Sequence, residues 1–395
     1  MDRRNTYFLQ ILSAALKGEQ AALNPPLTAE DWQWIAQQAQ RHKVLPLICQ
    51  AARDTVPPQL KASLRRQVAE QMLKTHTFLQ LNRHLCEAGL TPLVVKGIVC
   101  RELYPDPDLR QSSDEDLLLP QEQFEKGCDA MEAFGMTTDS TDPNAAERPY
   151  RMAENPLYIE LHRSLFPLDS DVFGNWNRFF EGCFDRAVTL DIAGEQVLTL
   201  NCTDHLLYLI LHAFKHFLHS GFGIRQVCDI VMYGKAHAAS VDWPQLLDRC
   251  CQVHAHLFTA AIFRIGEHCL HIDCPAPLKD LQVDETALLE DLLSAGIYGG
   301  ATESRKHSST VTLGAAAHRD KESGSSLRSA LFPPAKVLSD RYPYLKRHQW
   351  LLPVAWVSRM IRYGTRKNNG ENSASEALRI GNQRVALLRQ YGVIE

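Results

Sequence analysis

The sequence predicts an α+β protein in which a small mixed β-sheet is flanked by N-terminal and C-terminal helical regions. Apolar residues recur at three- and four-residue spacing over residues 5–87, and again from residue 203 to about residue 299, which is the period of an α-helix. Between these two regions, short β-branched or alternating runs bounded by Gly and Pro predict strands. Helices on both sides of a strand-rich middle therefore define the class.

The strand-rich middle begins after Gly89, where the first helical pattern ends. The run TPLVVKG at residues 91–97 is short and β-branched, which is typical of a buried strand, and it stops at Gly97 where the helical pattern IVCRELY begins. DEDLLLP at residues 114–120 predicts a second strand, and residues 121–135 predict a helix that ends at Gly135. Residues 91–135 are therefore expected to form a strand, a turn, a helix, a second strand and a second helix, in that order.

Further strands are expected before the second helical region. PLYIELH at residues 156–162 is the clearer of two candidates in its segment, and AVTLDIAGEQVLTL at residues 187–200 alternates about Gly194 as a hairpin does. The long helix from residue 203 is expected to begin with a Thr203–Asp204 cap.

The chain is longer than a usual single domain, so several packed units are expected. The predicted division is an N-terminal helical region at 1–75, an α/β core at 76–200, a helical domain that closes the cleft at 201–300, and a loop with a C-terminal helical tail at 301–395. Residues 299–327 are rich in Gly, Ser, Thr and charge, which predicts a connector.

Composition excludes several classes of protein. The net charge of -4 lacks the basic balance of a general nucleic-acid binder, so nucleic acid is the least favoured partner. The eleven cysteines are not at metal or disulfide spacings, and the first residues lack the apolar run of a signal peptide, which favours a cytoplasmic location. No apolar run reaches the roughly eighteen residues of a membrane span.

Two aspartates in the second predicted strand are the first candidate site. Residues i and i+2 of a strand share a face, so Asp114 and Asp116 are expected to project side by side while Glu115 points away. Like charges at this spacing require a cation, and a divalent metal with oxygen ligands is the obvious candidate. The alternative is an Asp-x-Asp pair that is merely solvated or caps a turn.

Neighbouring residues favour a phosphate site beside these carboxylates. Gly97 lies where a strand leads into a helix, and a helix amino end with close backbone approach binds anions. Lys96 supplies a point charge, and Arg110 can form a fork on a phosphate.

A third carboxylate is expected from the strand YIELH. Ile159 and Leu161 share its apolar face, which leaves Glu160 and His162 on the other face. Three carboxylates could hold two metal ions about 3.5–4 Å apart, the spacing that serves an in-line displacement.

The Lys-Gly turn, the stretch LYPDPDLRQSSDEDLLL and the later IELH together resemble the bacterial uncharacterised nucleotidyltransferase family of the polymerase-beta-like nucleotidyltransferase superfamily. The resemblance covers about residues 75–165 with motifs and the following helices more loosely. It implies a nucleotidyltransferase α/β core in which Asp114, Asp116 and Glu160 bind metal and act in catalysis, and in which Gly97 approaches the triphosphate.

The resemblance also implies that the helical half closes over the nucleotide, with Lys215 and His216 among the nucleotide-binding groups. Two residues depart from the superfamily pattern. Ile98 stands where Ser or Gly is usual, so Lys96 is expected to replace the missing phosphate contact. Glu115 stands where an apolar residue is commoner, and its charge would point toward the packing face.

Other readings of the second helical region remain open. His212 and His216 are one turn apart, which suits zinc, but a clear third ligand is lacking, and cleft-lining or core histidines explain the pair as well. Asp229 is expected to be structural, bonded to a group such as Arg225.

The predicted reaction is attack by an acceptor on the α-phosphorus of a nucleoside triphosphate, with release of pyrophosphate and two Mg²⁺ ions as cofactors, Mn²⁺ being an alternative ion. The acceptor is a protein side chain, a small molecule or an RNA end, RNA being the least favoured. Two alternatives remain: a decayed site that binds a nucleotide or a partner, and a metal-dependent phosphohydrolase or phosphotransferase.

Overall fold

The computed structural model describes residues 1–140, 142, 145–170, 172–219, 221–295, 348–356, 358 and 383–394. Contacts divide the chain into two compact units. The first comprises residues 1–212 and 224–285, and the second comprises residues 213–223 and 286–395. The predicted domain boundaries stay predictions.

The first unit contains the predicted mixed sheet, whose six strands lie in the order β3-β4-β2-β1-β6-β5. Strands β1 and β6 are parallel, as are β2 and β4, whereas the β1–β2, β3–β4 and β5–β6 pairs are antiparallel. The strands are β1 (Leu93–Val94), β2 (Glu115–Leu118), β3 (Glu147–Met152), β4 (Asn155–His162), β5 (Val188–Ile192) and β6 (Glu195–Thr199). The α+β class is therefore confirmed.

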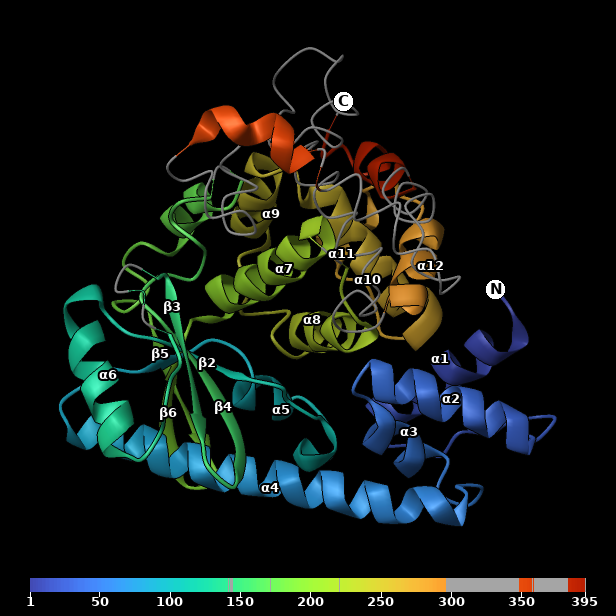
Figure 1. The fold of residues 1–395 in the computed structure, drawn as a ribbon. Helices are drawn as coiled ribbons and strands as arrows, with labels where there is room; N and C mark the ends of the chain where they lie inside the picture. Colours follow the sequence, from blue (N-terminus) through green and yellow to red (C-terminus); the bar gives the residue numbers. More distant parts are fainter. Residues whose placement is uncertain are drawn as a thin grey trace. The chain divides into compact units, whose positions relative to one another are not determined.

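Four helices precede the sheet, as the first helical pattern predicts. They are α1 (Arg3–Leu16), α2 (Ala29–Arg41), α3 (Leu45–Ala51) and α4 (Pro58–Glu87). The 30-residue α4 runs along the sheet and contacts β4 and β6 (Figure 1). Phe78, Leu81 and Leu85 of this helix are fully buried against the sheet, which stabilises the fold by roughly 1.5–3 kcal/mol for each side chain.

Short helical elements connect the strands. They are α5 (Ile98–Arg101), η1 (Pro107–Leu109), η2 (Gln121–Gln123), α6 (Phe124–Ala133) and η3 (Gly174–Phe180). Helix α6 adds Phe124 and Met131 to the same hydrophobic core as α4, so these two helices cover one face of the sheet. Leu117, Ile159 and Leu161 point to that face, as strand alternation predicts.

The second helical region also forms as expected. Its helices are α7 (Cys202–His219), α8 (Ile224–Ala236), α9 (Trp243–Gln252), α10 (His256–Leu270), α11 (Ala276–Lys279) and α12 (Thr286–Ala295). The expected Thr203–Asp204 cap of α7 is wrong. The backbone N–H groups of Thr203 and Asp204 each donate to the Asn201 side chain at 3.0 Å, because α7 begins at Cys202. The Asp204 carboxylate instead forms ion pairs with Arg186 and Arg249.

The described residues of the C-terminal part include the 3-10 helix η5 (Gln349–Leu351) and helical residues at 352–356 and 383–390. The predicted connector at 299–327 and the start of the predicted final helix lie outside the described residues. Among the helices that the structure describes, none has the length and hydropathy needed to cross a lipid bilayer.

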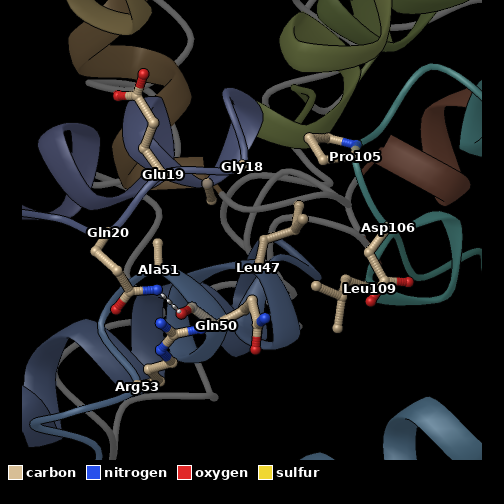
Figure 2. A pocket seen from close by; sticks show the side chains of 11 residues that line it. Gly18, Glu19, Gln20, Leu47, Gln50, Ala51, Arg53, Pro105, Asp106 and Leu109 are labelled. Atoms are coloured by element: carbon tan, nitrogen blue, oxygen red, sulfur yellow. Dashed lines mark hydrogen bonds between the residues drawn. The ribbon is translucent and has the colours of Figure 1, made fainter.

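A pocket of about 230 Å³ lies between the N-terminal helices and the segment that contains η1 (Figure 2). Its wall includes Gly18, Leu47, Arg53, Pro105 and Leu109. None of the acidic residues predicted to bind metal lines this pocket, so it is separate from the candidate site.

Candidate functional site

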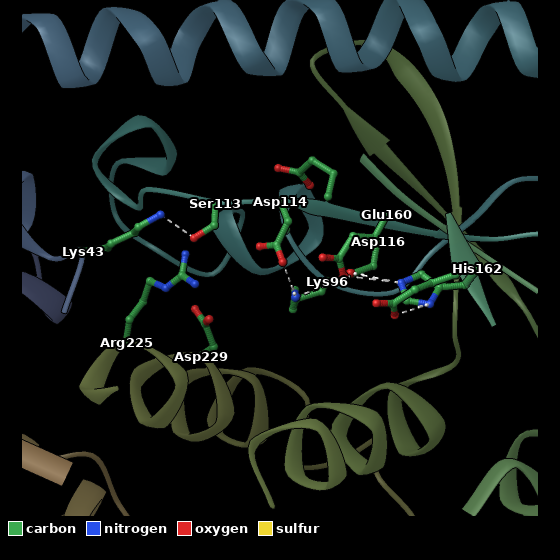
Figure 3. Close-up of polar contacts among 12 residues, drawn as sticks. Lys43, Lys96, Ser113, Asp114, Asp116, Glu160, His162, Arg225 and Asp229 are labelled. Carbon is green, nitrogen blue, oxygen red and sulfur yellow. Dashed lines mark hydrogen bonds and ion pairs between the residues drawn. The ribbon is translucent and has the colours of Figure 1, made fainter. Parts of the chain in front are cut away.

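Parallel pairing of β2 and β4 brings two of the predicted carboxylates together. Asp116 is the direct partner of Glu160 in the strand register, and both lie on the face of the sheet opposite the α4 and α6 core. His162, two residues after Glu160, shares that face. Ligand atoms of Asp116, Glu160 and His162 all lie within 4.8 Å of one another (Figure 3). In the described part of the chain, this is the group whose spacing could hold a metal ion.

Lys96 lies between the two aspartates. Its Nζ is 2.6 Å from Asp116 Oδ2 and 3.4 Å from Asp114 Oδ2, and the side chain is buried. Burial would lower the pKa of Lys96, but the negative charges of Asp114 and Asp116 outweigh burial and hold this pKa well above its ordinary value. The group predicted to contact a phosphate is thus the cation that balances the paired aspartates in this structure.

His162 is a site residue to which sequence reasoning gave no role. Its Nε2 lies 3.3 Å from Asp116 Oδ1 and 3.8 Å from Glu160 Oε2. Burial would lower its pKa, yet the hydrogen bond to Asp116 and the Asp116 charge raise it. Strand alternation placed His162 on the same face as Glu160, and this was the feature of the sequence that could have identified it as a site residue. Its contact with Asp116 depends on the pairing of β2 with β4.

Glu160 is the carboxyl group that is hardest to ionise in this cluster. Burial, followed by the negative charges of Asp116 and Asp114, raises its pKa to about 8. By contrast, the pKa of Asp116 lies well below its ordinary value, because Lys96 and His162 outweigh the effect of burial. The site therefore carries more negative charge than its two nearby cations balance, and a proton on Glu160 relieves the excess near neutral pH.

The Gly97 turn forms as predicted, but a carboxylate of the protein contacts its helix end. Gly97 has φ +60° and ψ -111°, a conformation that favours glycine. Glu115 Oε2 accepts a hydrogen bond from the Ile98 backbone N–H at 2.6 Å, and a Cβ added at Gly97 would lie 1.7 Å from this oxygen. Glu115 therefore points toward the packing face, as expected, and the Ile98 N–H at the amino end of α5 satisfies one of its two carboxylate oxygens.

Arg110 forms a fork, but on a carboxylate of the protein, and its predicted contact with a phosphate stays a prediction. Its Nε and Nη2 donate to Asp229 Oδ1 and Oδ2 at 3.1 and 2.6 Å, and the Tyr104 hydroxyl donates to Asp229 Oδ1 at 2.8 Å. Both charged side chains are almost fully buried. Asp229 is therefore held by an arginine, as expected, but the arginine is Arg110, since Arg225 donates to the Gln111 backbone carbonyl.

The remaining predicted residues, Lys215 and His216, lie in the last turns of α7 and belong to the second unit. Their nucleotide-binding role stays a prediction. The earlier turns of α7 belong to the first unit, where Tyr208 is fully buried. Burial and the negative charge of Asp116 raise the pKa of Tyr208 well above its ordinary value.

Three comparisons with known proteins bear on the resemblance, and they leave the bacterial origin and the polymerase-beta-like superfamily as predictions. No curated protein sequence matches the chain. Among solved structures, a similar chain is an antigenic nucleotidyltransferase-like protein from Paracoccidioides brasiliensis, with 13% sequence identity and a TM-score of 0.33. The match covers 52% of this chain and 94% of that one, and a TM-score this low carries no conclusion about activity.

A family model described as uncharacterised nucleotidyltransferase matches residues 28–271. That range includes the whole sheet, the carboxylate cluster and helices α7 to α9, and it spans more than half of the chain. The chain therefore belongs to the uncharacterised nucleotidyltransferase family.

Proposed function

We propose that this protein is a metal-dependent nucleotidyltransferase that moves a nucleoside monophosphate group from a nucleoside triphosphate to an acceptor, with release of pyrophosphate. The observation that carries the proposal is the buried cluster of Asp116, Glu160 and His162, with Asp114 nearby, in a chain of a nucleotidyltransferase family. The acceptor is a protein side chain or a small molecule with a free hydroxyl group, since the net acidic charge disfavours RNA.

The donor set fits a divalent cation. Asp116 Oδ2 is buried and, among the described residues, accepts no directed hydrogen bond, although Lys96 forms an ion pair with it. Glu160 carries a raised pKa because negative charge is in excess, and a cation relieves that excess as a proton does. The carboxylates of Asp116 and Glu160 suit Mg²⁺ or Mn²⁺, and Asp114 is the remaining carboxylate for a second ion. When bound, such ions supply positive charge that stabilises the transferring phosphoryl group.

The residues of the chain would act in three ways. Asp114, Asp116 and Glu160 hold the cations and thereby fix the position of the triphosphate. Lys96 balances the aspartates before a nucleotide binds, and its ammonium can then turn to a phosphate oxygen. The acceptor oxygen forms a bond to the α-phosphorus while the bond from that phosphorus to the bridging oxygen of pyrophosphate breaks. The hydroxyl proton passes to Glu160 or to a phosphate oxygen.

A second function is favoured by two observations. Lys96 pairs with both aspartates, and Glu115 contacts the helix end where the resemblance places a triphosphate. Both contacts suit a decayed site that binds a nucleotide or a partner without catalysis. They differ from the catalytic proposal in one measurable respect, because a decayed site forms no product.

The proposal is tested by calorimetric binding of each of the four ribonucleoside triphosphates, with and without Mg²⁺. The native protein is compared with an Asp114→Asn/Asp116→Asn variant, which removes two charges at nearly constant shape. Mg²⁺-dependent binding that the variant loses supports a nucleotide site. Binding that is identical in the variant contradicts the proposed metal ligands.

Product analysis then separates the three chemistries. Nucleotide labelled at the α-phosphate is mixed with candidate acceptors, and the released group is identified. Pyrophosphate and a labelled adduct support nucleotidyl transfer, whereas inorganic phosphate or a nucleoside diphosphate points to a phosphohydrolase or phosphotransferase. Binding without any product favours the decayed site.

A further inference from the structure

Three basic side chains converge on residues 111–113, the segment immediately before Asp114. Lys43, between α2 and α3, has its Nζ 2.5 Å from Ser113 Oγ. Lys74, on α4, donates to the Ser112 backbone carbonyl at 2.9 Å, and Arg225, on α8, donates to the Gln111 carbonyl. Figure 3 shows Lys43 and Arg225 pointing toward the segment that carries Ser113 and Asp114. All of these residues belong to the first unit.

Lys43, Lys74 and Arg225 form a basic cluster, and two of its members, Lys74 and Arg225, donate to backbone carbonyls. Among the described residues, neither Lys74 nor Arg225 forms an ion pair with a carboxylate, and Asp229 already holds the Arg110 fork. The Arg225 side chain belongs to a residue only 5% exposed, and its Nε has no hydrogen-bond partner there. A buried guanidinium donor without a partner is costly, so it points to a ligand that supplies an acceptor.

The three cations also act on one another. Burial, and then the charges of Arg225 and Lys74, lower the pKa of Lys43 to about 8. Burial and the charge of Arg110 lower the pKa of Arg225, and burial lowers the pKa of Lys74. For Lys74, the charges of Glu115 and Asp114 act against burial, and the charge of Arg225 acts with it. An anion bound among these three side chains would offset their mutual repulsion.

The groups predicted to bind phosphate already have carboxylate partners within the protein. Lys96 is paired with two aspartates, Arg110 is paired with Asp229, and the helix end at Gly97 is contacted by Glu115. The basic cluster, by contrast, has its donors directed at uncharged groups of residues 111–113, the segment that immediately precedes Asp114. A compact polyphosphate that reaches from the carboxylates suits such a confined site better than an extended nucleic-acid backbone does.

We infer that Lys43, Lys74 and Arg225 bind the β- and γ-phosphates of the nucleoside triphosphate, so that the N-terminal helical region completes the nucleotide site. This inference rests on the proposed function. It assigns the recognition of the triphosphate tail to residues from α4, α8 and the link between α2 and α3, and not to the Lys-Gly turn alone.

The test measures binding of inorganic tripolyphosphate, ATP and AMP to the full chain by calorimetry, with Mg²⁺ present. The variants are Lys43→Gln, Lys74→Gln and Lys74→Arg, and the control is Lys61→Gln, which removes an exposed lysine from the same helix as Lys74. A thermal unfolding curve for each variant establishes that it folds.

The two Gln variants should bind tripolyphosphate and ATP at least about tenfold more weakly than the native protein, since each loses a charge-assisted hydrogen bond. AMP affinity should stay unchanged, because AMP lacks the two phosphates in question. Lys74→Arg should keep most of the ATP affinity, and Lys61→Gln should match the native protein.

The outcomes separate the inference from the proposed function. ATP binding that is equally strong in the native protein and in both Gln variants overturns the inference and leaves the proposed function standing. A loss of ATP and AMP affinity by the same factor also overturns it, since the cluster would then act on the whole site. Failure of the native protein to bind any triphosphate overturns the proposed function, and the inference with it.

Discussion

Replacement of Glu160 by Gln should change the pH dependence of stability in a predictable direction. Burial and the charges of Asp116 and Asp114 raise the pKa of Glu160 from its ordinary value of 4.5 to about 8. Between these two pH values the folded protein holds a proton that the unfolded chain has released. The native protein should therefore lose stability as the pH rises from about 4.5 to about 8, and the Gln variant lacks this loss.

The size of the effect follows from the two pKa values. Their difference corresponds to about 5 kcal/mol as an upper limit. The side chain is 26% exposed, so solvent screens part of the interaction, and a measured change of about 2 to 5 kcal/mol is expected. His162 acts in the same direction, because its raised pKa gives stability that is lost as the pH rises, but the imidazole is present in both proteins.

The assay is urea unfolding of the native protein and Glu160→Gln in EDTA at several pH values between about 5 and 8. The free energy of unfolding of the variant minus that of the native protein should grow with pH. Glu154→Gln, an exposed change in the β3–β4 turn, is the control and should stay within about 0.5 kcal/mol of the native protein. With Mg²⁺ in place of EDTA, the native protein should gain stability near pH 8 and the variant should gain less.

A difference between native protein and variant that is equal at both ends of the pH range would refute the reasoning. It would mean that Glu160 ionises in the folded protein as it does in the unfolded chain. The burial of Glu160 beside Asp116 would then fail to hold in solution.

Three further changes test the packing around the site by urea unfolding. Gly97→Ala should destabilise the fold by about 2 to 4 kcal/mol, because the new Cβ displaces the Glu115 carboxylate from the Ile98 N–H and φ is positive; a loss below about 0.5 kcal/mol would contradict the contact. Asp229→Asn should cost about 3 kcal/mol or more, since it leaves the buried Arg110 without its counter-charge, and an unchanged midpoint would show that the pair is solvated. Tyr104→Phe should cost about 1.5 to 3 kcal/mol through loss of a hydrogen bond to the same carboxylate, so a larger effect than that of Asp229→Asn would be inconsistent.

Local patterns in the sequence predicted the fold class and the faces of the strands. Alternation placed Ile159 and Leu161 in the core and Glu160 on the opposite face, and the structure has this arrangement. Gly97 was predicted as the turn between a strand and a helix, and its positive φ bears this out. These features depend on backbone periodicity and on the conformational freedom of glycine, which are properties of a few neighbouring residues.

The partners of the buried charges were decided by tertiary structure. Arg110 and Asp229 are 119 residues apart in the chain, and His162 and Asp116 are 46 apart. The sequence patterns gave no role to Lys43, in the link between α2 and α3, or to Lys74 on α4, and only folding brings them to the segment before Asp114. The sequence by itself determined which strand residues face away from the core and at which end of a strand they lie. Only the three-dimensional packing decided which charged side chains form pairs, because an ion pair depends on the distance between two groups in space and not on their separation in the sequence.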